Sequence, residues 1–190
     1  MSIKYAILGF LSWRPFTGYE LKKQFADSLS FHWSGNNNQI YGALIQLHKE
    51  GAVTIEVQPQ EKYPTRKVYA ITELGRQWLR GWLLGEAELP EERNLVHIQL
   101  AWAEALDGGE LAALLGRYER VLEDQIIMCR ERLRRGAPEP ARSPRESLIW
   151  RRIDENRVSS YEAELAWARS LASEVAGLGA GHGGVREVAG

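Results

Sequence analysis

A short run of amide side chains gives this sequence its clearest candidate chemistry. Residues 34–44 read SGNNNQIYGAL and place Asn36, Asn37, Asn38 and Gln39 in the first turn of a segment with helical periodicity. Asparagine is unfavourable inside a helix, so three in succession need more than one reason. An amide can cap a helix, and it can also pair bidentately with the edge of adenine in the major groove of DNA.

The apolar periodicity of residues 36–50 separates these roles. Four apolar residues fall on one side and predict the core face of a helix: Ile40, Ala43, Leu44 and Leu47. We expect Asn36 to be the N-cap and Gln39 to complete a capping box with it. Glycine on the opposite side would let a nucleic acid approach closely, and an exposed isoleucine could meet a thymine methyl. The predicted DNA-facing set of this helix is Asn37, Asn38, Gln39, Tyr41, Gly42, Ile45, Gln46 and Lys49.

The elements around this helix predict a winged helix-turn-helix. An apolar stripe indicates a helix over residues 3–12, and Thr17 with Glu20 forms a capping box that opens a second helix. After the amide-rich helix, residues 53–57 and 67–71 alternate as the strands of a hairpin, and Thr72 caps a further helix. In this architecture the third helix enters the major groove and the hairpin wing touches the DNA backbone or the minor groove. Three basic residues of the hairpin therefore join the predicted DNA-binding set: Lys62, Arg66 and Lys67. Tyr19, in the helix that Thr17 and Glu20 open, joins it as a candidate phosphate contact.

Simpler readings stay open for several of these residues. Asn37, Asn38 and Lys49 could be solvated surface side chains, and Tyr19 could pack rather than contact a phosphate. Basic residues are also common at hairpin tips that have no function. The helix itself argues against a winged-helix module used for protein contact, because that role would favour an apolar or acidic exposed face on this helix.

The second half of the chain predicts an all-helical domain. Helices are indicated over residues 91–106, over 110–135 after a capping box at Asp107 and Glu110, and over 145–176. We therefore expect a mainly α protein with a DNA-binding domain over 1–85, a helical domain over 90–176 and a disordered tail over 177–190. An intrachain helical hairpin explains the apolar stripes of the two long helices nearly as well as a dimer bundle does.

Charge and motif content narrow the class of protein. Residues 1–85 hold 10 basic and 6 acidic residues, whereas the remainder holds 14 basic and 19 acidic, which suggests a mildly basic module on an acidic scaffold. Gly-rich phosphate loops, HExxH and GxSxG are absent from the sequence, so we expect no enzyme, no catalytic residue and no cofactor. His97 lacks a partner at metal-ligand spacing and Cys129 lies in an apolar stripe, so no metal site is expected. The single cysteine and the lack of a long apolar run predict a cytoplasmic protein without a membrane partner.

Three blocks of the N-terminal half resemble the PadR family of bacterial transcriptional regulators. The matching motifs are Gly-Tyr-Glu-Leu over 18–21, Gln-Ile-Tyr over 39–41 with the leucines and glycine that follow, and Val-Tyr…Thr…Gly over 68–75. The resemblance covers residues 3–84, and residues 90–175 resemble more loosely the helical C-terminal domain of the long subfamily. Gly42 is a departure, since many members of the family have a larger residue after the tyrosine.

This resemblance implies a homodimer, held by the C-terminal helices and part of the N-terminal helix, that binds a palindromic operator and usually represses. It also implies release from DNA by a small aromatic or apolar effector. Trp78, Trp82, Trp102, Trp150 and Trp167 lie in helices where a pocket could form, although aromatic residues at helical spacing are more often core. The effector residues stay unknown. A MarR-type regulator would need a longer N-terminal helix than this sequence has.

Overall fold

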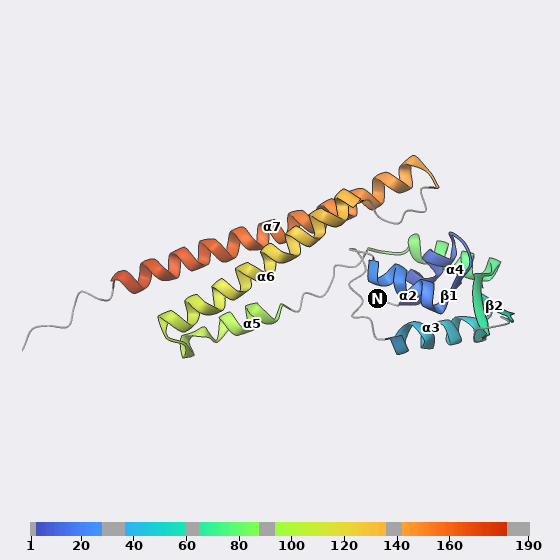
Figure 1. Cartoon of the computed structure of the whole chain (residues 1–190), viewed down its shortest axis with the longest axis horizontal. Coiled ribbons are helices and arrows are strands. Elements are labelled where there is room, and N and C mark those ends of the chain that lie inside the picture. The colour runs from blue at the N-terminus through green and yellow to red at the C-terminus, as the bar shows by residue number, and fades with distance from the viewer. Residues whose placement is uncertain (1–2, 28–36, 60–64, 88–93, 136–141, 182–190) are drawn as a thin grey trace, which may run out of the picture. The chain divides into compact units, whose positions relative to one another are not determined.

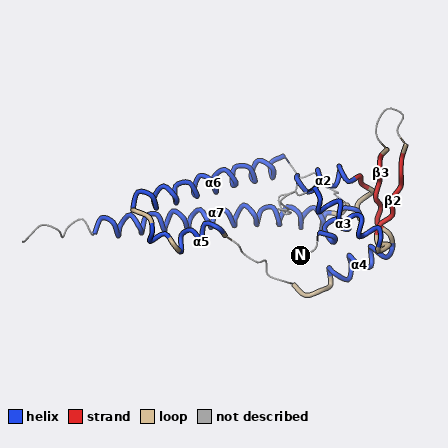
Figure 2. Tube along the Cα trace, turned by 90° about the horizontal axis from the view of Figure 1, so that it is seen from below, coloured by secondary structure: helices blue, strands red, loops and turns tan. Residues whose placement is uncertain are grey.

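The computed structural model describes residues 3–27, 37–59, 65–87, 94–135 and 142–181. The contacts of these residues divide into two units, one over residues 3–87 with residue 142 and one over 94–135 and 143–181. Both units are dominated by helices, and the strands belong to the first unit (Figure 1; Figure 2). Within the described ranges, no helix combines the length and the apolar character that crossing a membrane requires.

The N-terminal unit is a winged helix-turn-helix, as the sequence predicts. A three-stranded antiparallel sheet in the order β1-β3-β2 accompanies four helices, and β2 and β3 form the two-stranded wing. The short strand β1 was not predicted, because its two residues pair with partners about 50 positions away. The elements are α1 (Ile3–Leu11), β1 (Phe16–Thr17), α2 (Gly18–Asp27), α3 (Asn37–Lys49), β2 (Val53–Gln58), β3 (Arg66–Ile71) and α4 (Glu73–Leu83).

One apolar core holds the N-terminal unit together. Side chains from α1, α2, α3 and the sheet form a single buried cluster, and Leu8, Leu21, Leu44 and Leu47 in it are fully buried. Burying one leucine contributes roughly 1.5–3 kcal/mol, so this cluster fixes the angles at which α2, α3 and the wing meet. The two helices of the helix-turn-helix are therefore held by the same core that supports the wing.

Two glycines set the connection from α3 through the wing to α4. Gly51 has a φ of 77°, and the Ala52 amide donates to the Leu47 carbonyl at 2.9 Å, which ends α3 in a Schellman motif. A Cβ on Gly75 would lie 2.2 Å from the Ala52 carbonyl oxygen, so only glycine allows the first turn of α4 to pack there. The Thr72 hydroxyl caps α4 by accepting from the Gly75 amide at 3.1 Å, as predicted.

The C-terminal unit is a helical hairpin with a short helix beside it. α6 (Gly108–Arg135) and α7 (Pro144–Gly181) lie antiparallel, and α5 (Leu95–Ala101) with the 3-10 helix η1 (Ala103–Ala105) precedes them (Figure 1). The capping box that opens α6 is confirmed, because the Glu110 amide donates to Asp107 Oδ1 at 2.8 Å. The stripe residues Leu122 and Leu165 are buried between α6 and α7, so within one chain they serve the intrachain hairpin.

Two helix boundaries in this unit differ from the prediction. The expected helix over 91–106 is interrupted at Trp102, where α5 ends and η1 follows, and the Asn94 side chain caps α5 by accepting from the Val96 amide at 3.0 Å. The last helix continues to Gly181 rather than ending near residue 176, so the first part of the predicted disordered tail is helical. Residues 182–190 of that tail lie outside the described residues.

A polar cluster joins α5 to the long helices. Glu164 Oε1 on α7 accepts from the Tyr118 hydroxyl at 2.7 Å and from Asn94 Nδ2 at 3.3 Å, and it lies 2.9 Å from His97 Nε2. The His97 ring also meets Trp167 edge-on with centroids 5.0 Å apart. Burial and this carboxylate raise the pKa of Tyr118, so the phenol stays a donor to Glu164.

Candidate nucleic-acid interface

The buried face of α3 is the one that the sequence predicts. Ile40, Ala43, Leu44 and Leu47 are between 0% and 7% exposed and belong to the core of the N-terminal unit. This orientation turns the opposite side of α3 to solvent along its whole length. The predicted N-cap Asn36 lies outside the described residues, so the capping box with Gln39 stays a prediction.

The outward face of α3 presents the predicted reading residues. Asn38, Gln39, Gly42, Gln46 and Lys49 are exposed, and Ile45 is 65% exposed. A Cβ on Gly42 would meet nothing within 4 Å, so the space above this turn is open. Asn37 lies in the first turn of α3, and its side chain is outside the described part of the structure.

The Gln46 amide is less available for a contact with DNA than its outward position on α3 suggests. Its Nε2 donates to Glu50 Oε1 at 3.0 Å, and the same carboxylate receives Lys4 Nζ at 2.9 Å. The hydrogen bonds from Lys4 are the first cause that lowers the pKa of Glu50, followed by the bond from Gln46. Glu50 therefore stays charged and competes for the Gln46 amide, whereas nothing in this arrangement involves Ile45.

Two tyrosines flank the start of α2. Tyr19 is 71% exposed, which favours the contact role over the packing role considered for it. Tyr41 is 43% exposed and lies across the start of α2, since a Cβ on Gly18 would come within 2.4 Å of its ring. Burial raises the pKa of Tyr69, and the neighbouring Tyr41 raises it further. Tyr41 thus combines a packing role with a partly exposed ring.

The wing places its basic residues on β3. Arg66 and Lys67 are exposed at the start of this strand, while Lys62 lies outside the described residues. Arg66 is not a freely moving side chain, because its Nη2 donates to Glu20 Oε2 at 3.1 Å. The wing is therefore tied to the first turn of α2, which the sequence did not predict.

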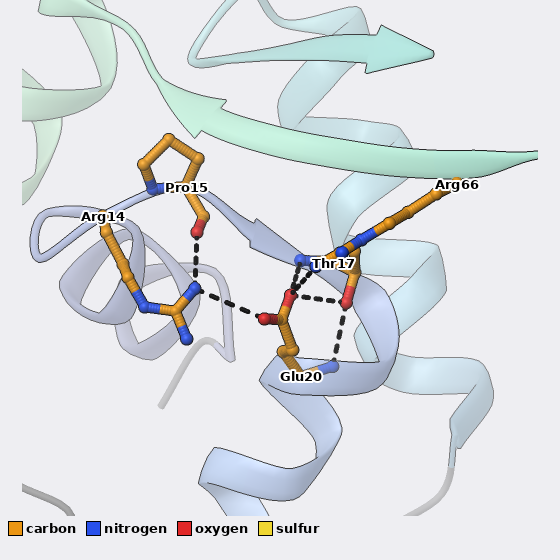
Figure 3. Close-up of polar contacts among 5 residues, drawn as sticks. All are labelled: Arg14, Pro15, Thr17, Glu20 and Arg66. Carbon is orange, nitrogen blue, oxygen red and sulfur yellow. Dashed lines mark hydrogen bonds and ion pairs between the residues drawn. The ribbon is translucent and has the colours of Figure 1, made fainter. Parts of the chain in front are cut away.

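Glu20 is the centre of this contact, and we refer to Arg14, Thr17, Glu20 and Arg66 as the Glu20 cluster (Figure 3). As predicted, Thr17 and Glu20 form a capping box: the Thr17 amide donates to Glu20 Oε2 at 2.8 Å, and the Glu20 amide donates to Thr17 Oγ1 at 3.1 Å. The Thr17 hydroxyl also donates to Oε2, at 2.7 Å. Arg14 Nη1 approaches the other oxygen, Oε1, at 3.4 Å.

The electrostatics of the Glu20 cluster favour a permanently charged carboxylate. Burial by itself would raise the pKa of Glu20, but the bonds from the Thr17 amide and hydroxyl, the bond from Arg66 and the charge of Arg14 lower it to about 2. Two guanidinium groups against one carboxylate leave a net positive charge at this position. The sequence does not predict a role for Arg14, because nothing in the local pattern relates it to the wing.

The structure also describes the histidine and the cysteine that the sequence offers as possible metal or thiol sites. Among the described residues, no group of three or more His, Cys, Asp or Glu side chains is arranged to hold a metal ion. His97 does acquire a carboxylate partner, Glu164, from 67 positions away, within the polar cluster. Cys129 is buried, and its burial raises the pKa of the thiol, as befits a packed side chain.

Two of the clefts in the described structure are lined by tryptophan. In the N-terminal unit, a cleft of about 580 Å³ between α1 and α4 is bordered by Trp78, Trp82 and Tyr5, with Tyr5 and Trp82 stacked at 5.0 Å. In the C-terminal unit, a cleft of about 510 Å³ between α5, η1 and α6 is bordered by Trp102 and Arg117. Trp82 and Trp102 are 45% and 77% exposed, so these two indoles are surface rather than core residues.

Comparison with known proteins agrees with this geometry. The model of the transcriptional regulator PadR-like family matches residues 7–81. The negative transcriptional regulator PadR of Bacillus subtilis is 36% identical over 89 residues, which are 47% of this chain and 49% of that protein. The chain spans about half the length of the curated relatives it matches.

Solved structures resemble the fold over most of the chain. Bacillus subtilis PadR in complex with operator DNA superposes with a TM-score of 0.80 at 22% identity, over 91% of this chain and 98% of that one. Bacillus subtilis PadR in complex with p-coumaric acid gives a TM-score of 0.71 at 24% identity, over 91% and 94% of the two chains. At these identities the likeness is one of fold, and it includes the helical C-terminal unit.

Proposed function

We propose that this chain, whose residues 7–81 match the PadR-like family of transcriptional regulators, is a homodimeric, sequence-specific DNA-binding repressor. The observation that supports this best is the outward face of α3, where exposed amides and an exposed isoleucine stand on a helix whose other face is fixed in the core. Amides read adenine and isoleucine meets thymine methyl groups, so the face suits base readout in the major groove.

The contacts divide into two groups by chemistry. Asn38, Gly42 and Ile45 lie where base edges would be read, and Gln39 and Asn37 border them at the start of α3. Backbone phosphates are assigned to the other residues of the predicted DNA-binding set, which carry hydroxyl, amide or cationic groups. These are Tyr19, Tyr41, Gln46, Lys49, Lys62, Arg66 and Lys67.

A second copy of the chain is the proposed partner. A single recognition helix reads only a few base pairs, and a two-fold dimer that binds two half-sites of a palindrome doubles the contact. The exposed apolar residues of α6 and α7 support an interface there. The alternative of a winged-helix module for protein contact is not favoured by the polar face of α3.

A small aromatic or apolar molecule is proposed to release the DNA. The p-coumaric acid complex of Bacillus subtilis PadR supports this idea, and the cleft with Trp78, Trp82 and Tyr5 offers stacked aromatic rings for such a ligand. DNA as the target and a lone buried cysteine favour a cytoplasmic location.

Fluorescence anisotropy tests the DNA-binding proposal. The protein is titrated against the DNA upstream of its own gene and against a scrambled duplex, each at several salt concentrations. We expect tighter binding to the upstream DNA and a linear loss of affinity with the logarithm of salt, because phosphate contacts release counterions. Equal affinity for both duplexes, or no dependence on salt, would contradict the proposal.

Asn38→Ala separates base reading from positioning in the same assay. We expect this variant to lose about 1–3 kcal/mol on the upstream DNA and little on the scrambled duplex. Asn156→Ala is a matched control, since it removes an exposed helical asparagine on α7 and should change neither affinity. An equal loss on both duplexes would make Asn38 a phosphate-side residue rather than a base reader.

A further inference from the structure

An acidic residue beside the basic side chains of the proposed DNA-binding surface needs an explanation. Glu20 lies between the start of α2 and the wing, and its side chain is 30% exposed. A lone carboxylate near DNA would repel the phosphates. Its charge is nonetheless kept, since its pKa of about 2 leaves it ionised throughout the physiological range.

The two arginines of the Glu20 cluster use only part of their hydrogen-bonding capacity. Arg14 donates through Nη1 alone, to Glu20 and to the Pro15 carbonyl at 3.0 Å, and Arg66 donates through Nη2 alone. A guanidinium group has five N–H donors in a planar fork that suits phosphate as well as carboxylate. Within the described part of the chain, the remaining donors of both groups have no protein acceptor, and the two side chains are 54% and 44% exposed.

The position of each guanidinium group is also restrained. Arg14 lies over the ring of Phe16 at 3.9 Å from its centroid, and that ring is 2% exposed. Arg66 belongs to β3, whose neighbour β1 leads directly into α2. Glu20 thus connects one cation before α2 to one cation on the wing, and Figure 3 shows it between them.

We propose that Glu20 is a positioning residue that holds Arg14 and Arg66 in place so that their remaining N–H donors bind DNA backbone phosphates beside α2 and the wing. The inference rests on the proposed DNA binding, to which it adds Arg14 as a contact and Glu20 as its support. A long flexible arginine loses conformational freedom when it binds a phosphate, and a carboxylate that orients it beforehand reduces that loss. The simpler alternative is that Glu20 only caps α2 through Thr17.

Glu20→Gln tests the proposal because glutamine also serves in a capping box. The variant keeps an acceptor for the Thr17 amide and removes the charge that holds the arginines. Coulomb's law alone predicts tighter DNA binding after a negative charge is lost. We expect the reverse: about tenfold weaker binding to the upstream DNA and to the scrambled duplex alike, with a shallower salt dependence.

Glu56→Gln is the matched control on the wing. Glu56 is an exposed carboxylate on β2 whose Oε1 accepts from Gln58 Nε2 at 3.1 Å. Its neutralisation removes the same charge without touching Arg14 or Arg66. We expect DNA affinity to stay equal or to increase slightly.

A double-mutant cycle identifies the route by which Glu20 acts. In an Arg14→Gln/Arg66→Gln background the capping box and Glu20 remain, and Glu20→Gln should then cause no further loss of affinity. A role confined to capping would produce the same loss in both backgrounds. This second arm also keeps the test valid if Glu20→Gln alone lowers the melting temperature.

The outcomes separate this proposal from the proposed function. If the wild-type protein binds no DNA, the function itself fails. If wild type binds and Glu20→Gln binds equally well or more tightly, with an unchanged salt slope, the positioning role is overturned and the function stands. A loss on the upstream DNA alone would also overturn it, because phosphate contacts do not read sequence.

Discussion

The two units of the chain bury apolar surface in different ways. In the described N-terminal unit a single cluster of fourteen buried residues unites helices and sheet, whereas the buried cluster between α6 and α7 has four members. Among the described residues both units leave large apolar side chains in solvent, but the C-terminal unit leaves more of them. On its two long helices these are Val121, Ile127, Met128, Leu148, Ile149, Ile153, Trp167 and Leu178.

This contrast indicates where each unit obtains its stability. The N-terminal core is complete within one chain, since its helices and its sheet cover one another. Long helices with exposed apolar side chains on outer faces bury too little within one chain and gain stability from association. We therefore predict that the first unit is stable as a monomer and that the stability of the second depends on the proposed partner copy.

The largest expected effect comes from charging the exposed apolar face of α7. Ile149 and Ile153 are one helical turn apart and are 51% and 44% exposed. In a two-fold dimer each substitution occurs twice, so Ile149→Asp/Ile153→Asp should cost about 4 kcal/mol or more of association free energy. Sedimentation equilibrium measures the dissociation constant, and DNA affinity should fall with it.

The control for the charged face keeps the helix, the spacing and the added charge. Ser159→Asp/Ala163→Asp places two aspartates one turn apart at exposed positions of α7 that carry no large apolar group. We expect this variant to remain a dimer. A wild-type protein that sediments as a monomer would contradict the predicted dependence of the C-terminal unit on a second copy, because the exposed residues of α7 would then need no partner.

A smaller effect is expected inside the N-terminal unit from Gly75→Ala. The new Cβ would lie 2.2 Å from a backbone oxygen, that of Ala52, which cannot turn away as a side chain would. We expect a loss of about 2–3 kcal/mol in the free energy of unfolding, measured with urea and followed by circular dichroism. Because the units have separate cores, dimerisation should be unchanged.

Gly81→Ala on the same helix is the matched control for Gly75→Ala. A Cβ there meets nothing within 4 Å, so the alanine should stabilise α4 by about 0.5–1 kcal/mol through its better helix propensity. Equal effects of the two substitutions would show that helix propensity, and not the close approach to the Ala52 carbonyl, explains Gly75. The clash argument would then be wrong.

Local patterns in the sequence predicted the parts of this structure that depend on neighbours along the chain. The capping boxes of α2 and α6, the wing strands and the buried face of α3 all come from signals within a few residues. The glycine that ends α3, Gly51, is also a local feature, and its φ is positive. These features follow from the helical and strand periods and from the few residues that satisfy helix ends.

Contacts between distant residues could not be predicted in the same way. Glu20 meets Arg66 across 46 positions, and His97 meets Glu164 across 67. Strand β1 consists of two residues and exists only because β3 lies beside it. The periodicity of α3 predicts its outward residues, whereas the ion pair of Glu50 with Lys4, which also spans 46 positions, becomes visible only in three dimensions.

A still smaller change in stability is expected from neutralising one carboxylate in each unit. Glu20 and Glu131 both have a pKa lowered to about 2, but by different partners. Partial burial alone would raise the pKa of Glu20, but Glu20 accepts hydrogen bonds from residues of β1 and β3, which lower it. Glu131 accepts hydrogen bonds from Arg134 and Arg135 of its own helix. Ion pairs within one exposed helix turn add little stability, since solvent screens them and flexible side chains must be ordered.

Urea unfolding of Glu20→Gln and Glu131→Gln across pH makes this difference measurable. A carboxyl whose pKa is lowered on folding stabilises the protein above its ordinary pKa near 4.5, and this stabilisation disappears as pH falls toward 2. Glu20→Gln should therefore cost about 1 kcal/mol at pH 7 after allowance for solvent screening, and the gap to wild type should close on acidification. Glu131→Gln should show no resolvable gap at any pH. If Glu131→Gln destabilises the protein as much as Glu20→Gln does, contacts between distant elements have no advantage over local ones, and the contrast between the units does not extend to their charges.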